Sequence, residues 1–141
     1  MKKYKRGYTA GVYDMFHIGH LNILKRAKKR CDYLIVAVST DELVLANKNK
    51  LPIIPFQQRL EIIKSIKYVD KVISQDDYSI QGKVKAVKDN NIDVVFVGSD
   101  WKNTEKWNNI SKELKKNGCD VIYLKHTDGI SSSILREKIK K

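Results

Sequence analysis

The sequence predicts an α/β protein with a Rossmann-like fold, in which a doubly wound, parallel, five-stranded sheet carries helices on both faces. Short apolar runs rich in β-branched residues recur five times, and they alternate with segments of helical periodicity. The apolar runs lack the alternation of a half-exposed strand, so both faces of the sheet are expected to be covered. At 141 residues, the chain fits a single domain over residues 1–141.

The expected strands are bounded by Gly, Asp or Ser and lie near residues 4–10 and at 32–39, 70–74, 93–98 and 120–124. The expected helices lie between and after them and cover HLNILKRAKKR, PFQQRLEIIKSIKY, SIQGKVKAVKDN, TEKWNNISKELKKNG and SSSILREKIKK. Pro55 is expected at the first position of the second of these helices, where a missing amide hydrogen has no cost. Right-handed crossovers between parallel strands then place helices on each face of the sheet.

Composition limits the classes of function. The formal net charge is +12, but the lysines are spread along the chain, and only MKKYKR and KRAKKR are densely basic. Solvated faces, with a basic entrance that attracts a phosphorylated substrate, explain this charge better than a nucleic-acid interface does. No apolar run approaches the roughly 20 residues of a membrane span, and the N-terminus shows no signal peptide. We therefore expect a soluble, cytoplasmic protein with neither nucleic acid nor membrane as a partner.

The loop after the first strand, TAGVYDMFHIGH, is the strongest functional signal. Ligands of a parallel sheet bind beyond the carboxyl ends of its strands, and Gly11 permits close backbone approach there. His17 and His20 lead into a helix whose N-terminal amides favour an anion, so the loop predicts a phosphate site. The sequence has neither GxGxxG after this strand nor GxxxxGK[ST], so no dinucleotide fingerprint or P-loop explains the site. A zinc site would need a third ligand, and no HExxH or cysteine partner is present.

The segment GVYDMFHIGH resembles the HxGH signature of the nucleotidyltransferase superfamily, and the longer pattern resembles the cytidylyltransferases. Further support comes from STDELVLANKNK after the second strand, PFQQRLEIIKSIKYVDKV in the middle, and GSDW followed by HTDGISSS near the end. Together these motifs span nearly the whole chain in the family's order. By its size, the chain is most similar to the compact glycerol-3-phosphate cytidylyltransferases.

The resemblance implies transfer of CMP from CTP, with Mg²⁺, to a small phosphorylated alcohol, giving a CDP-alcohol and pyrophosphate. Glycerol 3-phosphate is the first acceptor to expect, followed by ribitol, choline and ethanolamine phosphates. The family also suggests a homodimer and a setting in the synthesis of polymer, cell-wall or capsule precursors. An adenylyltransferase such as an FAD synthase is the alternative within the superfamily. Outside enzymes, the alternatives are a degenerate nucleotide sensor and a basic nucleic-acid-binding module.

The resemblance also implies roles for individual residues. The catalytic set is His17, His20, Asp14 and Lys48. The two histidines are expected to donate hydrogen bonds to the oxygens of the reacting phosphate. The nucleotide-binding set is Thr9, Ala10, Gly11, Gly19, Gly98, Asp100, Trp101, His126, Thr127, Gly129, Ile130, Ser131, Ser132 and Ser133. The substrate-binding set is Lys48, Lys50, Arg59 and Lys67.

Several of these residues have a purely structural alternative. Lys48 and Lys50 lie in an expected polar loop after the second strand, where lysines can be merely solvated. Arg59 can equally be a surface arginine of an amphipathic helix. Trp101 can pack in the core, an aspartate such as Asp14 is common in turns, and serines before a helix are ordinary N-caps.

Two positions depart from the family pattern. The family typically has arginine before TxGIS and before YVD, where this chain has His126 and Lys67. Arginine offers a planar, permanently charged fork, whereas lysine is a point charge and histidine can be neutral. Phosphate affinity or the identity of the acceptor is therefore expected to depend on these two positions. The sequence does not identify the ligands of a metal ion.

Overall fold

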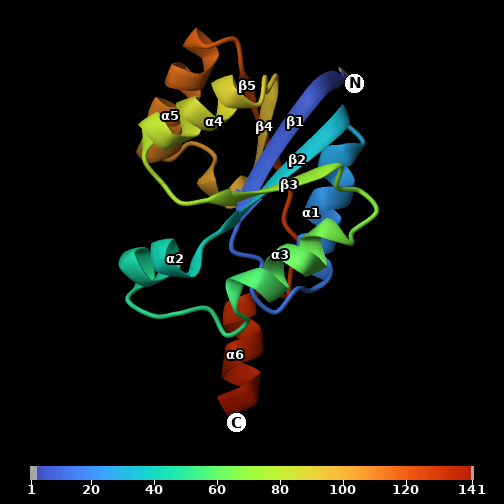
Figure 1. Ribbon diagram of the computed structural model, residues 1–141, viewed down its shortest axis with the longest axis vertical. Helices are drawn as coiled ribbons and strands as arrows, with labels where there is room; N and C mark the ends of the chain where they lie inside the picture. Colours follow the sequence, from blue (N-terminus) through green and yellow to red (C-terminus); the bar gives the residue numbers. More distant parts are fainter. Residues whose placement is uncertain (1–2, 141) are drawn as a thin grey trace.

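In the computed structural model, which describes residues 3–140, five parallel strands form one sheet in the order β3-β2-β1-β4-β5 (Figure 1). The strands are β1 (Tyr4–Gly11), β2 (Cys31–Ser39), β3 (Lys71–Gln75), β4 (Val94–Gly98) and β5 (Asp120–Leu124). The predicted parallel sheet is confirmed, and each strand overlaps its expected range. Strand order reverses at β1, so the carboxyl ends of β1 and β4 flank the crevice in which such a sheet binds ligands.

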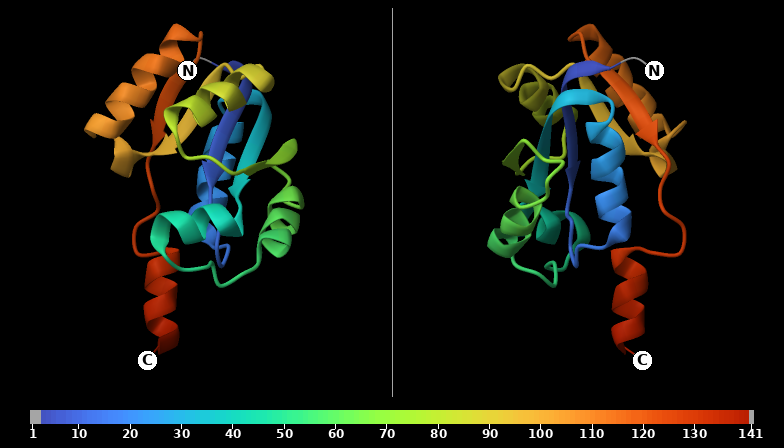
Figure 2. Two further views of the ribbon diagram at one scale, coloured as in Figure 1. Left: turned by 60° about the vertical axis from the view of Figure 1, so that its left-hand side comes forward. Right: turned by 90° about the vertical axis from the view of Figure 1, so that its right-hand side faces the viewer.

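Helices cover both faces of the sheet, as predicted. They are α1 (Ile18–Lys28), α2 (Asp41–Lys48), α3 (Phe56–Lys64), α4 (Ile80–Asp89), α5 (Glu105–Lys116) and α6 (Ser132–Lys140), with a short 3₁₀ helix η1 (Ser99–Trp101). Helices α4 and α5 pack on one face, and α1 and α3 pack on the other (Figure 1, Figure 2). Within residues 3–140, no helix is long and apolar enough to cross a membrane.

Strand β2 shows why the apolar runs lack alternation. Ile35 and Ala37 enter the core under α4 and α5, whereas Leu34, Val36 and Val38 enter the core under α1 and α3. All five side chains are fully buried. Because successive side chains of a strand point to opposite faces, a strand that is buried on both faces must be apolar throughout.

The structure corrects one expectation after β2. The segment expected as a polar loop forms helix α2, and Lys48 is its last residue. Thr40 caps this helix by accepting a hydrogen bond from the Leu43 amide at 3.2 Å. Asp41 and Glu42 follow in the first turn, where acidic residues are favoured. The sequence STDE carries this signal, because a capping residue followed by acids predicts a helix start.

Helix α3 begins one residue later than expected. Pro55 is its N-cap and not its first helical residue, so the predicted position was wrong by one. The Pro55 carbonyl accepts hydrogen bonds from the Gln58 and Arg59 amides, both at 3.1 Å. The helix therefore still starts at the proline that marks it in the sequence.

The C-terminal segment leaves the sheet after β5 and ends in α6. Gly129 has a φ of 79°, in the left-handed region that favours glycine, which confirms the predicted tight turn. Ser131 then caps α6, since its Oγ accepts a hydrogen bond from the Ile134 amide at 3.1 Å. None of the α6 residues is buried, and the helix points away from the rest of the molecule (Figure 1, Figure 2).

Candidate active site

A cavity of about 460 Å³ lies where the carboxyl ends of β1, β2, β3 and β4 meet. The last residues of these strands, Gly11, Ser39, Gln75 and Gly98, all line it. Helices α1, α2, α4 and α5 contribute further side chains. Strand order reverses at this edge, so the cavity occupies the position expected for a ligand.

Part of the predicted site lines this cavity. These residues are Thr9, Ala10, Gly11, His20, Lys48, Gly98, Trp101 and His126. His17 and Gly19 lie beside His20 at the start of α1. The predicted residues outside the cavity wall are His17, Gly19, Asp14, Lys50, Arg59, Lys67, Asp100, Thr127, Gly129, Ile130, Ser131, Ser132 and Ser133.

His17 and His20 start helix α1 and hold each other in place. His17 is the N-cap, and its Nδ1 accepts a hydrogen bond from the Gly19 amide at 3.1 Å. The amide of His17 donates to Nδ1 of His20 at 3.2 Å, which completes a reciprocal capping box. The two rings stack with their centroids 3.8 Å apart. Because both Nδ1 atoms accept hydrogen bonds, the proton of each neutral ring lies on Nε2.

The surroundings favour the neutral form of both rings. Burial lowers the pKa of His17. Burial, together with the neighbouring His17, lowers the pKa of His20 to about 4, against a smaller opposite effect of Asp14. The Nε2 atom of His17 is buried and has no hydrogen-bond partner among the described residues. A buried donor without a hydrogen-bond partner is unfavourable. A ligand oxygen that accepted a hydrogen bond from Nε2 would remove this cost, and the bond would favour binding of the ligand.

The C-terminal motif packs on the histidine motif. The side-chain amide of Asn22, in α1, donates to Thr127 Oγ1 at 2.9 Å. A Cβ on Gly19 would lie 2.9 Å from Cε1 of His17, so the absence of a side chain makes room for that ring, and it would lie in ordinary contact, 3.4 Å, with Cγ2 of Ile130. The N-terminal ends of α1 and α6 therefore lie close together (Figure 2). This arrangement brings two segments that are far apart in the sequence to one side of the site.

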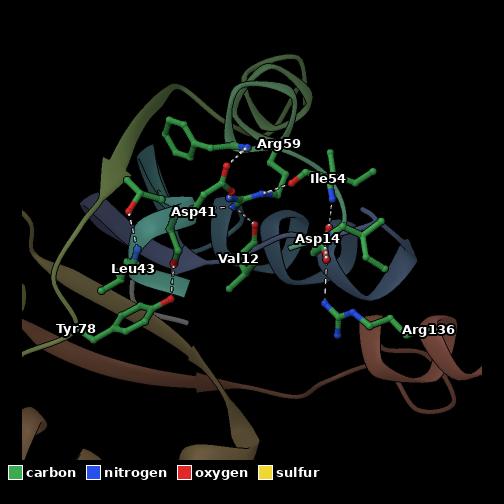
Figure 3. A network of polar contacts seen from close by, with 12 residues as sticks. Val12, Asp14, Asp41, Leu43, Ile54, Arg59, Tyr78 and Arg136 are labelled. Carbon is green, nitrogen blue, oxygen red and sulfur yellow. Dashed lines mark hydrogen bonds and ion pairs between the residues drawn. The ribbon is translucent and has the colours of Figure 1, made fainter. Parts of the chain in front are cut away.

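Asp14 connects loops and does not face the cavity. Its carboxylate accepts hydrogen bonds from the Ile53 and Ile54 amides at 2.9 and 2.8 Å and from Arg136 at 2.8 Å (Figure 3). Burial alone would raise the pKa of Asp14, but these hydrogen bonds outweigh it and hold the pKa below its usual value. The Asp14 carbonyl accepts from Ser132 Oγ at 2.5 Å. The geometry gives Asp14 a positioning role between the loop after β1 and α6.

Arg59 is completely buried, which the sequence did not indicate. Its Nε donates to the Ile54 carbonyl, and its Nη1 donates to the carbonyls of Val12 and Ser39, each at 2.8 Å (Figure 3). Its Nη2 pairs with Asp41 at 2.7 Å. The guanidinium thus ties the ends of β1 and β2 to the loop before α3. This geometry does not support Arg59 as a ligand of the substrate phosphate, because its donors are used inside the protein.

The end of β4 forms another part of the wall. A Cβ on Gly98 would meet no atom within 4 Å, so the space beside this residue is open. Trp101 is 47% exposed and lines the cavity, which rules out the core-packing alternative. Trp107 of α5 is the tryptophan that packs in the core. His126 Nδ1 lies 3.2 Å from Asp100 Oδ1, which joins GSDW to the C-terminal motif.

Two of the predicted substrate-binding lysines lie outside the cavity. Lys50 is exposed in the loop after α2. Lys67 precedes β3, at the amino-terminal edge of the sheet, and its ammonium lies 5.3 Å from the ring centroid of Tyr68. The cavity is at the opposite, carboxyl edge, so the structure does not bring Lys67 to the site of its own chain. Lys48, at the end of α2, does reach the cavity.

Some residues of the cavity wall were not predicted. Lys83 of α4 and Lys106 of α5 line it, together with Asn47 and Tyr78. The hydroxyl of Tyr78 donates to Ser39 Oγ at 2.8 Å. Tyr78 follows β3, so the rule that selects the loops after strands could have identified it. The two lysines give no such signal in a chain with 28 Lys and Arg residues.

A doubly wound parallel sheet, with a histidine-capped helix beside the cavity at its carboxyl edge, defines the class of HxGH nucleotidyltransferases. The sequence pattern of the family described as "Cytidylyltransferase-like" matches residues 8–138. The chain belongs to this family. It is therefore an enzyme of the nucleotidyltransferase type.

Individual relatives agree with this class over nearly their full length. The chain is 38% identical over 135 residues to the glycerol-3-phosphate cytidylyltransferase of Bacillus subtilis (strain 168), covering 96% of this chain and 97% of the relative. It is 34% identical over 144 residues to an FAD synthase of Thermococcus kodakarensis, covering 98% of this chain and 93% of the relative. Among solved structures, the lipopolysaccharide core biosynthesis protein from Thermoplasma volcanium GSS1 is similar with a TM-score of 0.70 and 30% identity, covering 87% of this chain and 96% of that one.

Proposed function

We propose that the protein transfers CMP from CTP to a small phosphorylated alcohol, with glycerol 3-phosphate as the first acceptor. The observation that carries this proposal is the pair of neutral Nε2–H donors that His17 and His20 hold at the start of α1 beside the cavity. The similarity to glycerol-3-phosphate cytidylyltransferases supports the choice of nucleotide and acceptor.

In the proposed reaction, a phosphate oxygen of the acceptor attacks the α-phosphorus of CTP, and the bond from that phosphorus to pyrophosphate breaks. The second pKa of a phosphomonoester lies near 6, so the acceptor is mostly ionised at pH 7 and needs no general base. The main requirement is to stabilise the negative charge on the oxygens around the α-phosphorus. His17 and His20 supply hydrogen-bond donors for those oxygens, and the amides of the first turn of α1 add a fixed dipole.

The proposed nucleotide site extends from β4 to α6. The open space beside Gly98 receives the base, and Trp101 forms an apolar wall. Asp100, which pairs with His126, is the proposed partner of the cytosine amine. The triphosphate runs toward the N-terminal end of α6. The residues proposed to hold it there are Thr127, Gly129, Ile130, Ser131, Ser132 and Ser133, in addition to Thr9, Ala10, Gly11 and Gly19 near β1.

CTP is proposed to enter as its Mg²⁺ complex, with the ion held by phosphate oxygens of the nucleotide. Among the described residues, no group of three or more His, Cys, Asp and Glu side chains is placed to hold a metal ion. The Asp14 carboxylate already serves Ile53, Ile54 and Arg136. We therefore propose that Mg²⁺ enters with the substrate and is held mainly by its phosphate oxygens.

The acceptor phosphate is proposed to contact Lys48, which lines the cavity from the end of α2. Lys50, two residues further on, is exposed and does not line the cavity. Choline and ethanolamine phosphates are the other acceptors to compare, since a curated relative is an ethanolamine-phosphate cytidylyltransferase. Ribitol phosphate is the larger polyol to include.

We further propose that the enzyme acts in the cytoplasm as a homodimer, without nucleic acid or membrane as a partner. The homodimer is proposed from the family resemblance, and the exposed apolar side chains Ile134 and Ile139 of α6 are residues that contact with a second copy would cover. The scattered lysines support only weak, strongly salt-dependent nucleic-acid binding. Light scattering after size-exclusion chromatography tests the dimer. DNA binding measured across salt concentrations tests whether nucleic acid is bound only weakly.

An adenylyltransferase is the second candidate, because FAD synthases are among the relatives. A pyrophosphate-release screen separates the two reactions. It combines CTP, ATP, GTP and UTP with glycerol 3-phosphate, the other phosphorylated alcohols and FMN. CTP with a phosphorylated alcohol is expected to give the highest rate. A clear preference for ATP with FMN would replace the proposed function, and no turnover with any pair would favour a nucleotide sensor.

A further inference from the structure

Tyr8 of β1 carries a buried hydroxyl group that the fold does not use. The residue is only 5% exposed, and its side chain packs in the core under α4 and α5. Its hydroxyl has no hydrogen-bond partner among the described residues, and burial is what raises its pKa. The hydroxyl of a buried tyrosine usually finds a partner. This one is therefore available to a ligand.

The same side chain lies where two cavities meet. Tyr8 lines the cavity of about 460 Å³ described above and also a smaller one of about 200 Å³. The smaller cavity is lined mainly by residues of β3, of α4 and of the loop between them. Gln75 and Lys83 line both cavities as well. An occupant of the larger cavity that extends past these three residues therefore enters the smaller one.

The wall of the smaller cavity suits hydroxyl groups better than a second phosphate. It contains the carboxylates of Asp76, Asp77 and Asp89, which repel an anion but accept hydrogen bonds from hydroxyl groups. Gln75 is only 8% exposed, and its side-chain oxygen accepts a hydrogen bond from Ser39 at 3.1 Å. Its side-chain nitrogen has no partner among the described residues, so Gln75 and Tyr8 together offer donors to a neutral, hydroxyl-rich ligand.

The order of the strands places the smaller cavity on the acceptor side of the site. In the proposed function, the base lies beside Gly98 at the end of β4, and the reacting phosphate lies at the histidines that follow β1. The strand order β3-β2-β1-β4-β5 leaves the ends of β2 and β3 for the acceptor, whose phosphate is proposed to contact Lys48. A tail that extends further from the base reaches β3 and α4, which line the smaller cavity.

We infer that the smaller cavity is a subsite for a polyol tail, and that the enzyme accepts phosphorylated polyols longer than glycerol, with Tyr8 and Gln75 bonding the hydroxyl groups of the tail. This inference rests on the proposed function and deepens it by naming the class of acceptor. Ribitol 5-phosphate has two more hydroxyl groups than glycerol 3-phosphate. A polar site that bonds a substrate hydroxyl discriminates against a substrate without it, because its own polar groups are then left unpaired.

The test compares glycerol 3-phosphate and ribitol 5-phosphate as acceptors for CTP. In the unmodified protein, kcat/KM for ribitol 5-phosphate is expected to be at least as high as kcat/KM for glycerol 3-phosphate, and a lower value would overturn the inference. Tyr8→Phe removes only the hydroxyl group. It is expected to lower the ratio of the ribitol value to the glycerol value by about three- to tenfold, the range for one lost hydrogen bond.

Tyr123→Phe is the matched control, because Tyr123 packs against the same core but lines neither cavity. It should leave the ratio unchanged. Urea unfolding shows whether each variant folds, and Tyr8→Phe should be no less stable than the unmodified protein, since the lost hydroxyl bonds to no described residue. If Tyr8→Phe does not fold, Gln75→Glu takes its place with the same expected fall in the ratio. This variant keeps the oxygen that accepts from Ser39 and removes the amide donor.

Direct binding separates this inference from the proposed function. Isothermal titration calorimetry measures the Kd of ribitol 5-phosphate without turnover, and Tyr8→Phe should raise it by the same about three- to tenfold. If glycerol 3-phosphate releases pyrophosphate from CTP but Tyr8→Phe changes neither the ratio nor this Kd, the subsite is overturned and the proposed function stands. If no acceptor releases pyrophosphate, yet ribitol 5-phosphate binds and Tyr8→Phe weakens its binding, the proposed function fails and the polyol subsite stands.

Discussion

The backbone amide of His17 donates a hydrogen bond to Nδ1 of His20, and the two imidazole rings stack with their centroids 3.8 Å apart. Each ring uses one nitrogen to start helix α1, because both Nδ1 atoms accept from backbone amides. The other nitrogen, Nε2, is left for a ligand. Capping and the proposed chemistry therefore belong to different atoms of the same side chain, and a suitable substitution separates them.

Asparagine is that substitution, because its side-chain oxygen can take the place of Nδ1 but it has no group at the position of Nε2. His17→Asn and His20→Asn are expected to lower kcat by roughly 10²-fold or more, the range for losing one donor to a developing oxyanion. His17→Ala also removes the cap and should lower the unfolding free energy by about 1 kcal/mol. His17→Asn still caps the helix, so its unfolding free energy should fall by much less. Pyrophosphate release and urea unfolding measure the two effects. Near-normal turnover in both asparagine variants would show that Nε2 plays no part in the chemistry.

The low pKa of His20 predicts a loss of stability in mild acid. The pKa is about 4 in the folded protein and 6.5 ordinarily, so between these values the unfolded chain binds more protons. The unfolding free energy should therefore fall as the pH drops from 6.5 toward 4, by at most about 1.4 kcal/mol per pH unit for this group. His17 acts in the same direction, whereas Asp14, whose pKa is lowered from 3.8, acts at lower pH.

Urea unfolding at pH 7.0, 6.0 and 5.0 tests this expectation. The unmodified protein should lose unfolding free energy at each step, and His20→Asn should show a smaller loss over the same range. Equal pH dependence in the two proteins would mean that the imidazole of His20 is as easily protonated in the folded state as in the unfolded chain.

The sheet was predictable from sequence because burial on both faces leaves a direct trace. Strand β2 is apolar at Leu34 and Ile35 alike, and the same property marks β4. Helix α2 was missed because it is only eight residues long, too short for periodicity to stand out. Its capping residue, Thr40, followed by two acids, was the better signal.

The sequence predicted the fold better than it predicted the residues of the candidate site. Helical spacing places Arg59 on α3 but does not tell whether that position faces solvent or the ends of β1 and β2, which depends on how α3 docks. Lys83 and Lys106 were overlooked because nothing in the sequence marks them as residues of a cavity. Each resembles the many solvated lysines until the tertiary structure brings α4 and α5 to the same cavity.

Substitution of Arg59 should therefore lower the unfolding free energy of the protein more than it weakens substrate binding. Arg59→Met leaves the Val12, Ser39 and Ile54 carbonyls without their donor, and breaking a buried ion pair costs about 3–5 kcal/mol. Arg59→Lys should rescue little, because one ammonium cannot reach all these groups. Lys64→Met, an exposed change on α3, is the control. A stable Arg59→Lys protein with a raised KM for the acceptor would restore Arg59 to the substrate site.

Helix α6 is attached to the rest of the protein through Asp14, whose carbonyl accepts a hydrogen bond from Ser132 and whose carboxylate pairs with Arg136. Arg136 pairs with the buried Asp14 at 2.8 Å, and no residue of α6 is itself buried. Arg136→Gln should therefore loosen α6 while the sheet stays intact. Amide hydrogen exchange in residues 132–140 is expected to accelerate by about tenfold, equivalent to roughly 1.4 kcal/mol of local stability, with no change in β1 or β2.

The same variant links this attachment to nucleotide binding. If the N-terminal end of α6 holds the triphosphate, the KM for CTP should rise in Arg136→Gln, and the KM for the acceptor should change little. Lys138→Gln removes a charge from the same helix without touching Asp14, so it should leave both exchange and KM unaltered. Faster exchange with an unchanged KM for CTP would separate the two roles: Arg136 would anchor α6, but the helix start would not bind the nucleotide, and the triphosphate would depend on α1 and its histidines.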